Sequence, residues 1–205
     1  MSQLAPSFPD KTITLGNWTD SNDRALLTIE DSSVVQEVFL LDLKQGSLKP
    51  IGRTSNVPKD RLHKMVSKKF TTRDGESIYG YLTKPKGKVE RLIVYIHGGP
   101  YGIRDFDSYD FSEQYLASKG AAVLKVNYRG SGGYGTNFME DAYKEWGGRL
   151  LNDIADATQA VQKELGIGRE KTCAFGASYG GYAALAMAYK SVSYTHLTLP
   201  TMDHG

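Results

Sequence analysis

The chain has 205 residues and 40% hydrophobic content, and its charged side chains leave a formal net charge of +2. This balance argues against a polyanionic partner such as nucleic acid, and no run of 18 apolar residues exists to cross a membrane. The single cysteine excludes a disulfide framework. The length suits one good core, or one domain and part of another. The first residues lack the basic and apolar parts of a signal peptide, and compartment and oligomeric state stay open.

Residues 1–62 are rich in predicted β-strand. The stretches 25–30 and 35–43 are apolar and β-branched, turn residues bound them, and residues 12–15 favour a shorter strand. Two or three strands leave one sheet face unburied. Their order with the polar turns resembles one blade of a β-propeller, which needs several blades. We therefore expect residues 1–62 to be the end of a larger β-propeller; a short β-extension on the main domain is the alternative. Residues 51–61 are polar and predict a linker.

Residues 63–190 alternate predicted strands with predicted helices. The segments 65–72 and 77–84 form a predicted hairpin, because an Asp-Gly turn joins them. The remaining segments are buried strands at 92–96, 121–126 and 172–175, and helices at 111–119 and 150–165. Such alternation predicts an α/β fold, with a mostly parallel sheet and flanking helices. In these sheets, chemistry lies at the carboxyl ends of the strands.

The strongest motif is Gly176-Ala-Ser-Tyr-Gly180, a G-x-S-x-G pattern between the last buried strand and an Ala-rich helix. A serine on such a sharp turn exposes its hydroxyl for nucleophilic attack. Flanking glycines suit a turn that is too tight for side chains. The sequence therefore predicts Ser178 as a nucleophile. The structural alternative is a Gly-rich helix start with a capping serine.

A second Gly-rich loop, His97-Gly-Gly-Pro, follows the buried strand at 92–96. Acyl transfer through a serine needs two donors for the oxyanion of the tetrahedral intermediate. One is normally the N–H of the residue after the nucleophile, here Tyr179, and the Gly98-Gly99 segment suits the other. We expect His97 to hold this loop in place rather than to act as the catalytic base.

A third loop, residues 127–135, carries several glycines. Neither the Walker pattern nor the dinucleotide fingerprint is present, which argues against phosphate binding. The four histidines are scattered. We therefore expect no cofactor and no metal.

Together these motifs resemble the prolyl oligopeptidase family of serine peptidases, especially its acylaminoacyl-peptidase and dipeptidyl-peptidase-like branch. The matching stretches are Phe70-Thr-Thr-Arg-Asp-Gly-Glu-Ser-Ile-Tyr-Gly-Tyr-Leu, Val94-Tyr-Ile-His-Gly-Gly-Pro, Val126-Asn-Tyr-Arg-Gly-Ser-Gly-Gly-Tyr-Gly, Glu145-Trp-Gly with Asp153, and Gly176-Ala-Ser-Tyr-Gly-Gly-Tyr-Ala-Ala-Leu. The resemblance implies a β-propeller paired with an α/β-hydrolase catalytic domain that acts on short peptides.

For the site, the resemblance implies Ser178 as nucleophile and the N–H groups of Gly99 and Tyr179 as oxyanion donors. It implies structural roles for Trp146, Gly147 and Asp153.

The end of the chain departs from the family pattern. The resemblance implies an Asp and then a His well downstream of the serine, whereas His196 precedes Asp203, and His204 directly follows that aspartate. We therefore expect a chain truncated at both ends, in which residues 63–190 are the N-terminal part of the peptidase domain. Residues 191–205 resemble a translated sequencing adapter, and we expect them to be non-native.

The function expected is that of a serine-type peptidase forming an acyl-enzyme on Ser178, with this chain an incomplete and inactive fragment. An esterase of the same fold and a non-catalytic fragment are the alternatives. The expected partners are short peptide substrates, with neither nucleic acid nor a membrane.

Overall fold

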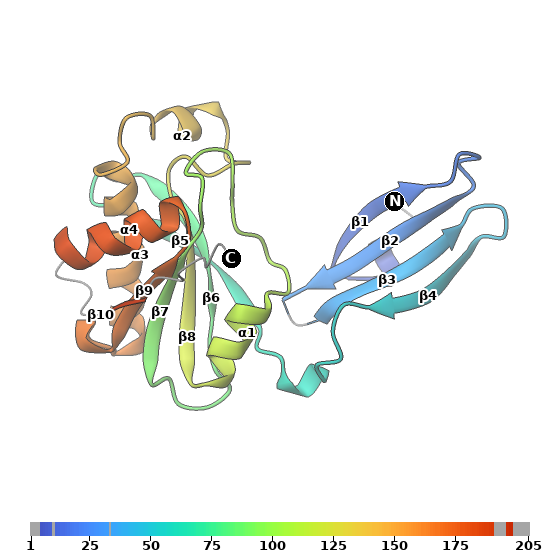
Figure 1. Cartoon of the computed structure of the whole chain (residues 1–205), viewed down its shortest axis with the longest axis horizontal. Helices are drawn as coiled ribbons and strands as arrows, with labels where there is room; N and C mark the ends of the chain where they lie inside the picture. Colours follow the sequence, from blue (N-terminus) through green and yellow to red (C-terminus); the bar gives the residue numbers. More distant parts are fainter. Residues whose placement is uncertain (1–4, 10, 33, 191–195, 199–205) are drawn as a thin grey trace, which may run out of the picture. The chain divides into compact units, whose positions relative to one another are not determined.

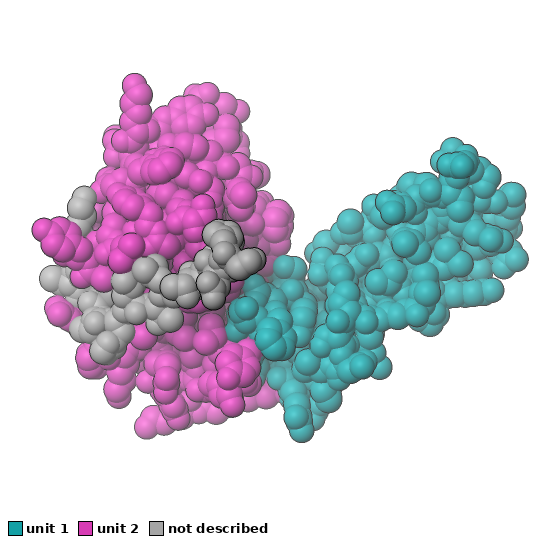
Figure 2. Space-filling model, in the orientation of Figure 1, with its two compact units in different colours: residues 1–64, 107–114 teal, residues 65–106, 115–205 magenta. Residues whose placement is uncertain are grey.

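The structure is a computed structural model that describes residues 5–9, 11–32, 34–190 and 196–198. The chain divides into two compact units (Figure 2). The first unit combines residues 1–64 with 107–114, and the second combines residues 65–106 with 115–205. Each unit contains its own β-sheet.

The first unit contains a four-stranded antiparallel sheet in the order β1-β2-β3-β4 (Figure 1). Its strands are β1 (Thr12–Trp18), β2 (Arg24–Asp31), β3 (Val34–Asp42) and β4 (Ser47–Arg53). Short 3-10 turns lie at Ala5–Ser7 and Lys59–Arg61. The alternating pattern of β2 buries Ala25, Leu27 and Ile29 on one face. The strands expected near 12–15, 25–30 and 35–43 are confirmed.

Strand β4 corrects one expectation. Residues 51–53 were expected in a linker, but they complete β4, which pairs with β3. Pro50 and Gly52 weaken the strand signal in the sequence. On an edge strand, however, a proline does not interrupt a second ladder of hydrogen bonds, so the sheet tolerates it.

The second unit contains a six-stranded sheet in the order β10-β9-β7-β8-β6-β5. Its strands are β5 (Met65–Thr71), β6 (Ser77–Thr83), β7 (Arg91–Ile96), β8 (Ala121–Asn127), β9 (Thr172–Gly176) and β10 (His196–Thr198). Strands β8, β7, β9 and β10 are parallel, whereas β5 with β6 and β6 with β8 are antiparallel. Three of the five strand pairings are parallel, so the expected sheet is confirmed in part, and the sheet is mixed. The tight turn after Thr71 makes β5 and β6 a hairpin, and β6 then pairs antiparallel with β8.

Four α-helices are described, with a short 3-10 turn at Arg169–Lys171 before β9. They are α1 (Phe111–Ser118), α2 (Thr136–Glu140), α3 (Arg149–Leu165) and α4 (Tyr179–Lys190). Helix α3 packs on β5 and β8, α4 packs on β7 and β9, and the two helices contact each other. They therefore form one layer on the sheet (Figure 1). The predicted helix at 150–165 is confirmed, and Gly166 ends it with a left-handed φ of 64°.

The core of the second unit lies between this sheet and its helices. All seven residues of β8 are buried, as are Leu150, Ile154 and Val161 on the apolar face of α3. No helix among the described residues has the length and hydropathy for a membrane crossing. In the same part of the chain, no cluster of three His, Cys, Asp or Glu is suited to a metal ion.

The predicted non-native stretch 191–205 lies outside the described residues, except for the backbone of β10. This strand pairs parallel with β9.

Candidate active site

The residues of the candidate site lie after the ends of three neighbouring parallel strands. In the order β9-β7-β8, Ser178 lies just after β9, His97 directly after β7 and Tyr128 directly after β8. The carboxyl ends of parallel strands meet at one edge of a sheet, where α/β proteins bind their ligands. The sheet therefore brings the serine turn and the loop after β7 together, as the sequence predicts.

Ser178 occupies the turn between β9 and α4. Its φ of 55° is left-handed, which is uncommon for a residue other than glycine. The residue is exposed. Helix α4 starts at the next residue, and the Gly180 N–H donates to the Ala177 carbonyl at 2.9 Å. This is the geometry that a nucleophile elbow requires.

Gly180 lets the turn pack tightly against the end of β7. A Cβ at Gly180 would lie only 2.1 Å from the Ile96 carbonyl oxygen and 3.1 Å from that of His97. Both obstacles are backbone atoms, so a side chain here would push the start of α4 away from the strand. The second glycine of the G-x-S-x-G motif is thus required by this close approach.

Gly98 lies directly against the Ser178 side chain. A Cβ at Gly98 would be 3.5 Å from the Ser178 Cβ and 3.9 Å from its hydroxyl oxygen. Glycine therefore leaves the space beside the hydroxyl open to a reacting group. The loop after β7 is close enough for its backbone to contact a group bound to Ser178.

The Gly98 carbonyl accepts from His97 and lies near the Tyr128 hydroxyl, whose single proton is closer to the His97 carbonyl. His97 Nδ1 lies 2.8 Å from this oxygen, and the Tyr128 hydroxyl lies 3.3 Å from it. The Gly98–Gly99 peptide is trans, so the Gly99 N–H points opposite to the held carbonyl. Gly99 itself has a φ of 119°, which a side chain rarely permits. Fixing the carbonyl thus fixes the direction of the Gly99 donor.

His97 is engaged at both ring nitrogens. Besides the Gly98 contact, Nε2 lies 3.0 Å from the Ser131 hydroxyl, and the ring stacks on Tyr128 with centroids 4.3 Å apart. A neutral ring with its proton on Nδ1 donates to Gly98 and accepts from Ser131. Burial lowers the pKa of His97 to about 4, so the ring is neutral at pH 7. These contacts suit a residue that holds the loop.

Tyr179 places the other expected donor at the start of α4. As the first helical residue, its backbone N–H has no partner one turn back within the helix. Its side chain is buried, and its hydroxyl donates to the Trp146 carbonyl at 2.9 Å. The Trp146 indole in turn donates to the Tyr101 hydroxyl at 2.8 Å. The backbone around this donor is thereby tied to the segment before α3.

Comparisons with known proteins point to one family of peptidases. Residues 107–194 match the prolyl oligopeptidase family, also described as peptidase S9. The chain is 37% identical over 126 residues to dipeptidyl aminopeptidase BIII of Pseudoxanthomonas mexicana, which covers 57% of the chain and 18% of that relative. By this segment the chain is related to the prolyl oligopeptidase family. The resemblance inferred from the motifs is confirmed, and with it a relationship to serine hydrolases.

Other relatives extend the match toward the N-terminus. Dipeptidyl-peptidase 5 of Porphyromonas gingivalis is 25% identical over 174 residues, covering 82% of the chain and 25% of that relative. A solved structure of puromycin hydrolase superposes with a TM-score of 0.76 at 28% identity, covering 94% of the chain and 30% of that structure. The chain thus spans less than a third of the length of these relatives.

The sequence motifs did not assign Tyr128 or Ser131 a role. Both lie in the loop after β8, and both contact His97. One signal was available, because this loop follows the strand that neighbours β7 in the sheet. Which side chains of the loop turn toward His97 depends on backbone angles that residue spacing does not give.

Proposed function

We propose that this chain carries the nucleophile and oxyanion-binding half of a serine-type peptidase that hydrolyses short peptides. The observation that supports this most is the left-handed Ser178 at the end of β9, with Gly98 against its side chain. The Ser178 hydroxyl oxygen attacks the peptide carbonyl carbon while a base takes its proton. The base then gives this proton to the amine nitrogen as the C–N bond breaks and the amine leaves. Water then hydrolyses the acyl-enzyme and frees the serine.

The N–H groups of Gly99 and Tyr179 are the proposed oxyanion donors. The held Gly98 carbonyl and the start of α4 support this assignment, because each fixes the direction of one N–H. Backbone donors that are already in place need no reorganisation when charge develops on the oxygen. Loss of one such donor typically costs about 10²–10³ in kcat.

For this chain, we propose weak activity at most. His97 is the histidine of the second unit whose side chain is described, and its ring nitrogens already contact Gly98 and Ser131. Loss of the histidine from a comparable triad costs about 10⁶ in kcat. An intact oxyanion hole retains roughly 10³–10⁴ over the reaction in water.

The proposed domain assignment follows the two sheets. Residues 1–62 are proposed to be the end of a β-propeller, which the antiparallel sheet β1–β4 supports. Residues 63–190 are proposed to be the N-terminal part of an α/β-hydrolase peptidase domain. The elbow after β9 and the helix layer formed by α3 and α4 support this part.

A fluorophosphonate probe tests the nucleophile. We expect slow labelling at Ser178, detected by peptide mass spectrometry, and no labelling of that peptide in Ser178→Ala. Ser67→Ala is the matched control, because it removes an exposed serine hydroxyl from β5 in the same unit. Equal labelling of several serines would contradict the nucleophile, and rapid labelling at Ser178 would contradict the weak activity.

An esterase is the second candidate, because esterases of this fold use the same elbow and a similar His-Gly-Gly loop. Hydrolysis of peptide amides and of matched simple esters by the wild-type chain and by Ser178→Ala separates the two. Ser178-dependent turnover of esters alone would favour the esterase. A non-catalytic fragment would show neither turnover nor Ser178 labelling.

A further inference from the structure

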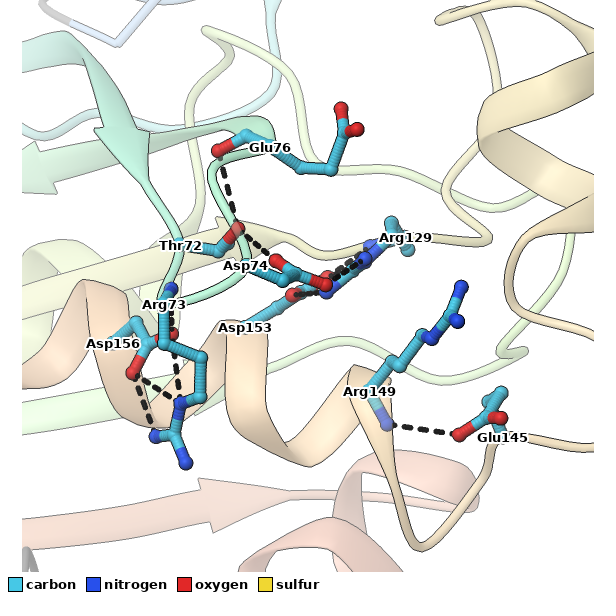
Figure 3. A network of polar contacts seen from close by, with 9 residues as sticks. All are labelled: Thr72, Arg73, Asp74, Glu76, Arg129, Glu145, Arg149, Asp153 and Asp156. Atoms are coloured by element: carbon cyan, nitrogen blue, oxygen red, sulfur yellow. Dashed lines mark hydrogen bonds and ion pairs between the residues drawn. The ribbon is translucent and has the colours of Figure 1, made fainter.

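Arg129 is a buried cation directly after Tyr128, and two carboxylates hold it (Figure 3). Its Nε and Nη2 donate to the two oxygens of Asp153, at 3.0 and 2.6 Å, and its Nη1 donates to Asp74 at 2.6 Å. The side chains of Arg129 and Asp153 are 3% and 0% exposed. These residues come from the loop after β8, from α3 and from the turn between β5 and β6.

The same carboxylate also holds the backbone of the loop. Asp153 Oδ2 accepts a hydrogen bond from the Arg129 N–H at 2.9 Å. Asp153 therefore fixes the peptide between Tyr128 and Arg129 as well as the guanidinium. Charged, two-point hydrogen bonds of this kind are short and directional, so they define the backbone where Tyr128 leaves β8.

Tyr128 connects Arg129 to the His97–Gly99 loop after β7, which we call the oxyanion loop. Its side chain is fully buried, its ring stacks on His97, and its hydroxyl donates to the His97 carbonyl at 2.9 Å. The same hydroxyl lies 3.3 Å from the Gly98 carbonyl oxygen, which is opposite the Gly99 donor. A continuous chain of contacts therefore runs from α3 to the Gly99 N–H.

A purely stabilising role does not explain a charged group here. A buried ion pair costs desolvation energy, and apolar residues of similar volume often stabilise a protein as well or better. Apolar packing does not fix the direction of a backbone segment. An ion pair that also binds a backbone N–H fixes the course of a loop, which hydrophobic contact does not do.

We propose that Arg129, with Asp153 and Asp74, positions the oxyanion loop by fixing Tyr128 against His97 and Gly98. This inference rests on the proposed function, because it assigns the Gly99 N–H as the donor that is positioned. Arg129 is a positioning residue and touches no reacting atom. Its loss leaves Ser178 in place and lets the Gly98–Gly99 peptide rotate away from its reactive direction.

Helix α3 provides a matched control three residues further along. Asp156 accepts from Nε and Nη2 of Arg73, and it also accepts from the Arg73 backbone N–H at 2.8 Å (Figure 3). The hydrogen-bond pattern is similar to that of the Asp153 pair, although the Arg73 side chain is 52% exposed, and it ties α3 to the turn after β5. Asp156→Asn therefore removes an equivalent set of contacts without releasing Tyr128.

The experiment compares Asp153→Asn, Asp74→Asn and Asp156→Asn by ¹⁵N NMR of the His97 ring and by fluorophosphonate labelling of Ser178. His97→Gln assigns the ring signals among the four histidines. In Asp153→Asn we expect the pKa of His97 to rise from about 4 toward 6.5 as the ring regains water. We expect the labelling rate constant to fall roughly ten- to a hundredfold.

The direction of the His97 shift separates positioning from a simple charge effect. Loss of a negative charge near a histidine lowers its pKa, so a rise means that the ring has left its buried position. Asp74→Asn should move His97 and the labelling rate in the same direction by less, because Arg129 keeps Asp153. Asp156→Asn should lower the denaturation midpoint and leave both readouts at their wild-type values.

Two results would overturn the proposal. The first is an unshifted His97 ring in both Asp153→Asn and Asp74→Asn. The second is an equal shift in Asp156→Asn. If Asp153→Asn does not fold, Asp74→Asn decides, because the Asp74 side chain is 40% exposed and leaves Arg129 one carboxylate. Failure of wild-type Ser178 to label would contradict the proposed function, while a shifted His97 ring would still support the positioning contacts.

Discussion

The two sheets of the chain differ in how far each strand is covered. Every residue of β8 in the mixed sheet is buried, whereas no residue of β4 in the antiparallel sheet is buried. Helices α3 and α4 cover one face of the mixed sheet, and β8 has a paired strand on each side. Strand β4 pairs with β3 alone. The mixed sheet thus holds its strand ends by packing on several sides.

This difference explains where the candidate site lies. An oxyanion hole needs donors that stay in place, and such donors need a rigid support. The ends of β7, β8 and β9 supply that support, because each strand has a neighbour on both sides. The edge strands β1 and β4 have no buried residue that could hold a loop in this way.

The largest expected effect comes from removing a core side chain of β8. Leu124 is fully buried between Leu82 of β6 and Val94 of β7. Leu124→Ala should lower the free energy of unfolding of the second unit by about 2–5 kcal/mol. Ile51→Ala in β4 is the matched control. Its side chain is 58% exposed, so the change should stay within about 0.5 kcal/mol.

The two tryptophans allow each unit to be measured separately. Trp18 lies in β1 of the first unit, and Trp146 precedes α3 in the second. Urea unfolding of Trp18→Phe reports the second unit through Trp146 fluorescence, and Trp146→Phe reports the first. Similar losses for Leu124→Ala and Ile51→Ala would contradict the contrast between the two sheets.

Acid should weaken the second unit first. The pKa of His97 falls to about 4 in the folded chain because burial disfavours the charged ring. The unfolded chain takes up this proton near pH 6.5, so the contribution is complete above pH 6.5 and is lost as the pH falls toward 4. The slope approaches about 1.4 kcal/mol for each pH unit.

His97→Gln is the test of this slope. In the Trp18→Phe background, the variant should lose the pH dependence between 6.5 and 4 while remaining less stable at pH 7. Strands β1–β4 contain no histidine, so the same titration in Trp146→Phe should be flatter. His63 belongs to the first unit. It is therefore changed to Gln in both tryptophan backgrounds, with and without His97→Gln, so that it does not add to the measured slope. An unchanged slope in His97→Gln would refute the assignment.

The sequence predicted the well-packed parts of the fold best. Strands 92–96, 121–126 and 172–175 are continuous apolar runs, and helix 150–165 has a clear apolar face, so burial and periodicity agree. Strand β4 was not predicted, because Pro50 and Gly52 have low strand propensity. In the structure, pairing with β3 overrides that propensity. The sequence predicted the β5–β6 hairpin but not its position in the sheet, because that position depends on the antiparallel pairing of β6 with β8.

The candidate site was predictable only in part. The motif places Ser178 on a turn, and the structure gives that turn a left-handed backbone. The roles of Gly99 and Tyr179 as donors remain proposals. Tyr128, Arg129 and Asp153 form a contact chain across 24 residues, and it exists only because β8 and α3 pack together. Spacing in a single sequence gives no measure of such packing.

The smallest expected effect compares one carboxylate from each unit. The Arg129 donor holds the pKa of Asp74 at about 2, and the Gln45 backbone N–H lowers the pKa of Asp42 in the first unit. Carboxyls with lowered pKa values stabilise the folded state above pH 4 and lose this contribution as the pH falls through the folded pKa. Both units should therefore weaken in the same acid range, unlike their behaviour between pH 6.5 and 4.

Asp74→Asn and Asp42→Asn test that convergence. In Asp74→Asn, the free energy of unfolding measured through Trp146 should change less with pH between pH 4 and 2. The difference from wild type over this range should be less than about 1 kcal/mol, because water screens a side chain that is 40% exposed. Asp42→Asn should flatten only the Trp18-detected slope. Asp74→Asn should also flatten the slope between pH 6.5 and 4, but by less than His97→Gln, because a weaker hold on Tyr128 raises the pKa of His97 only part of the way toward 6.5. If Asp74→Asn flattened this slope more than His97→Gln does, the acid sensitivity there would belong to the Arg129 contacts and not to the His97 ring.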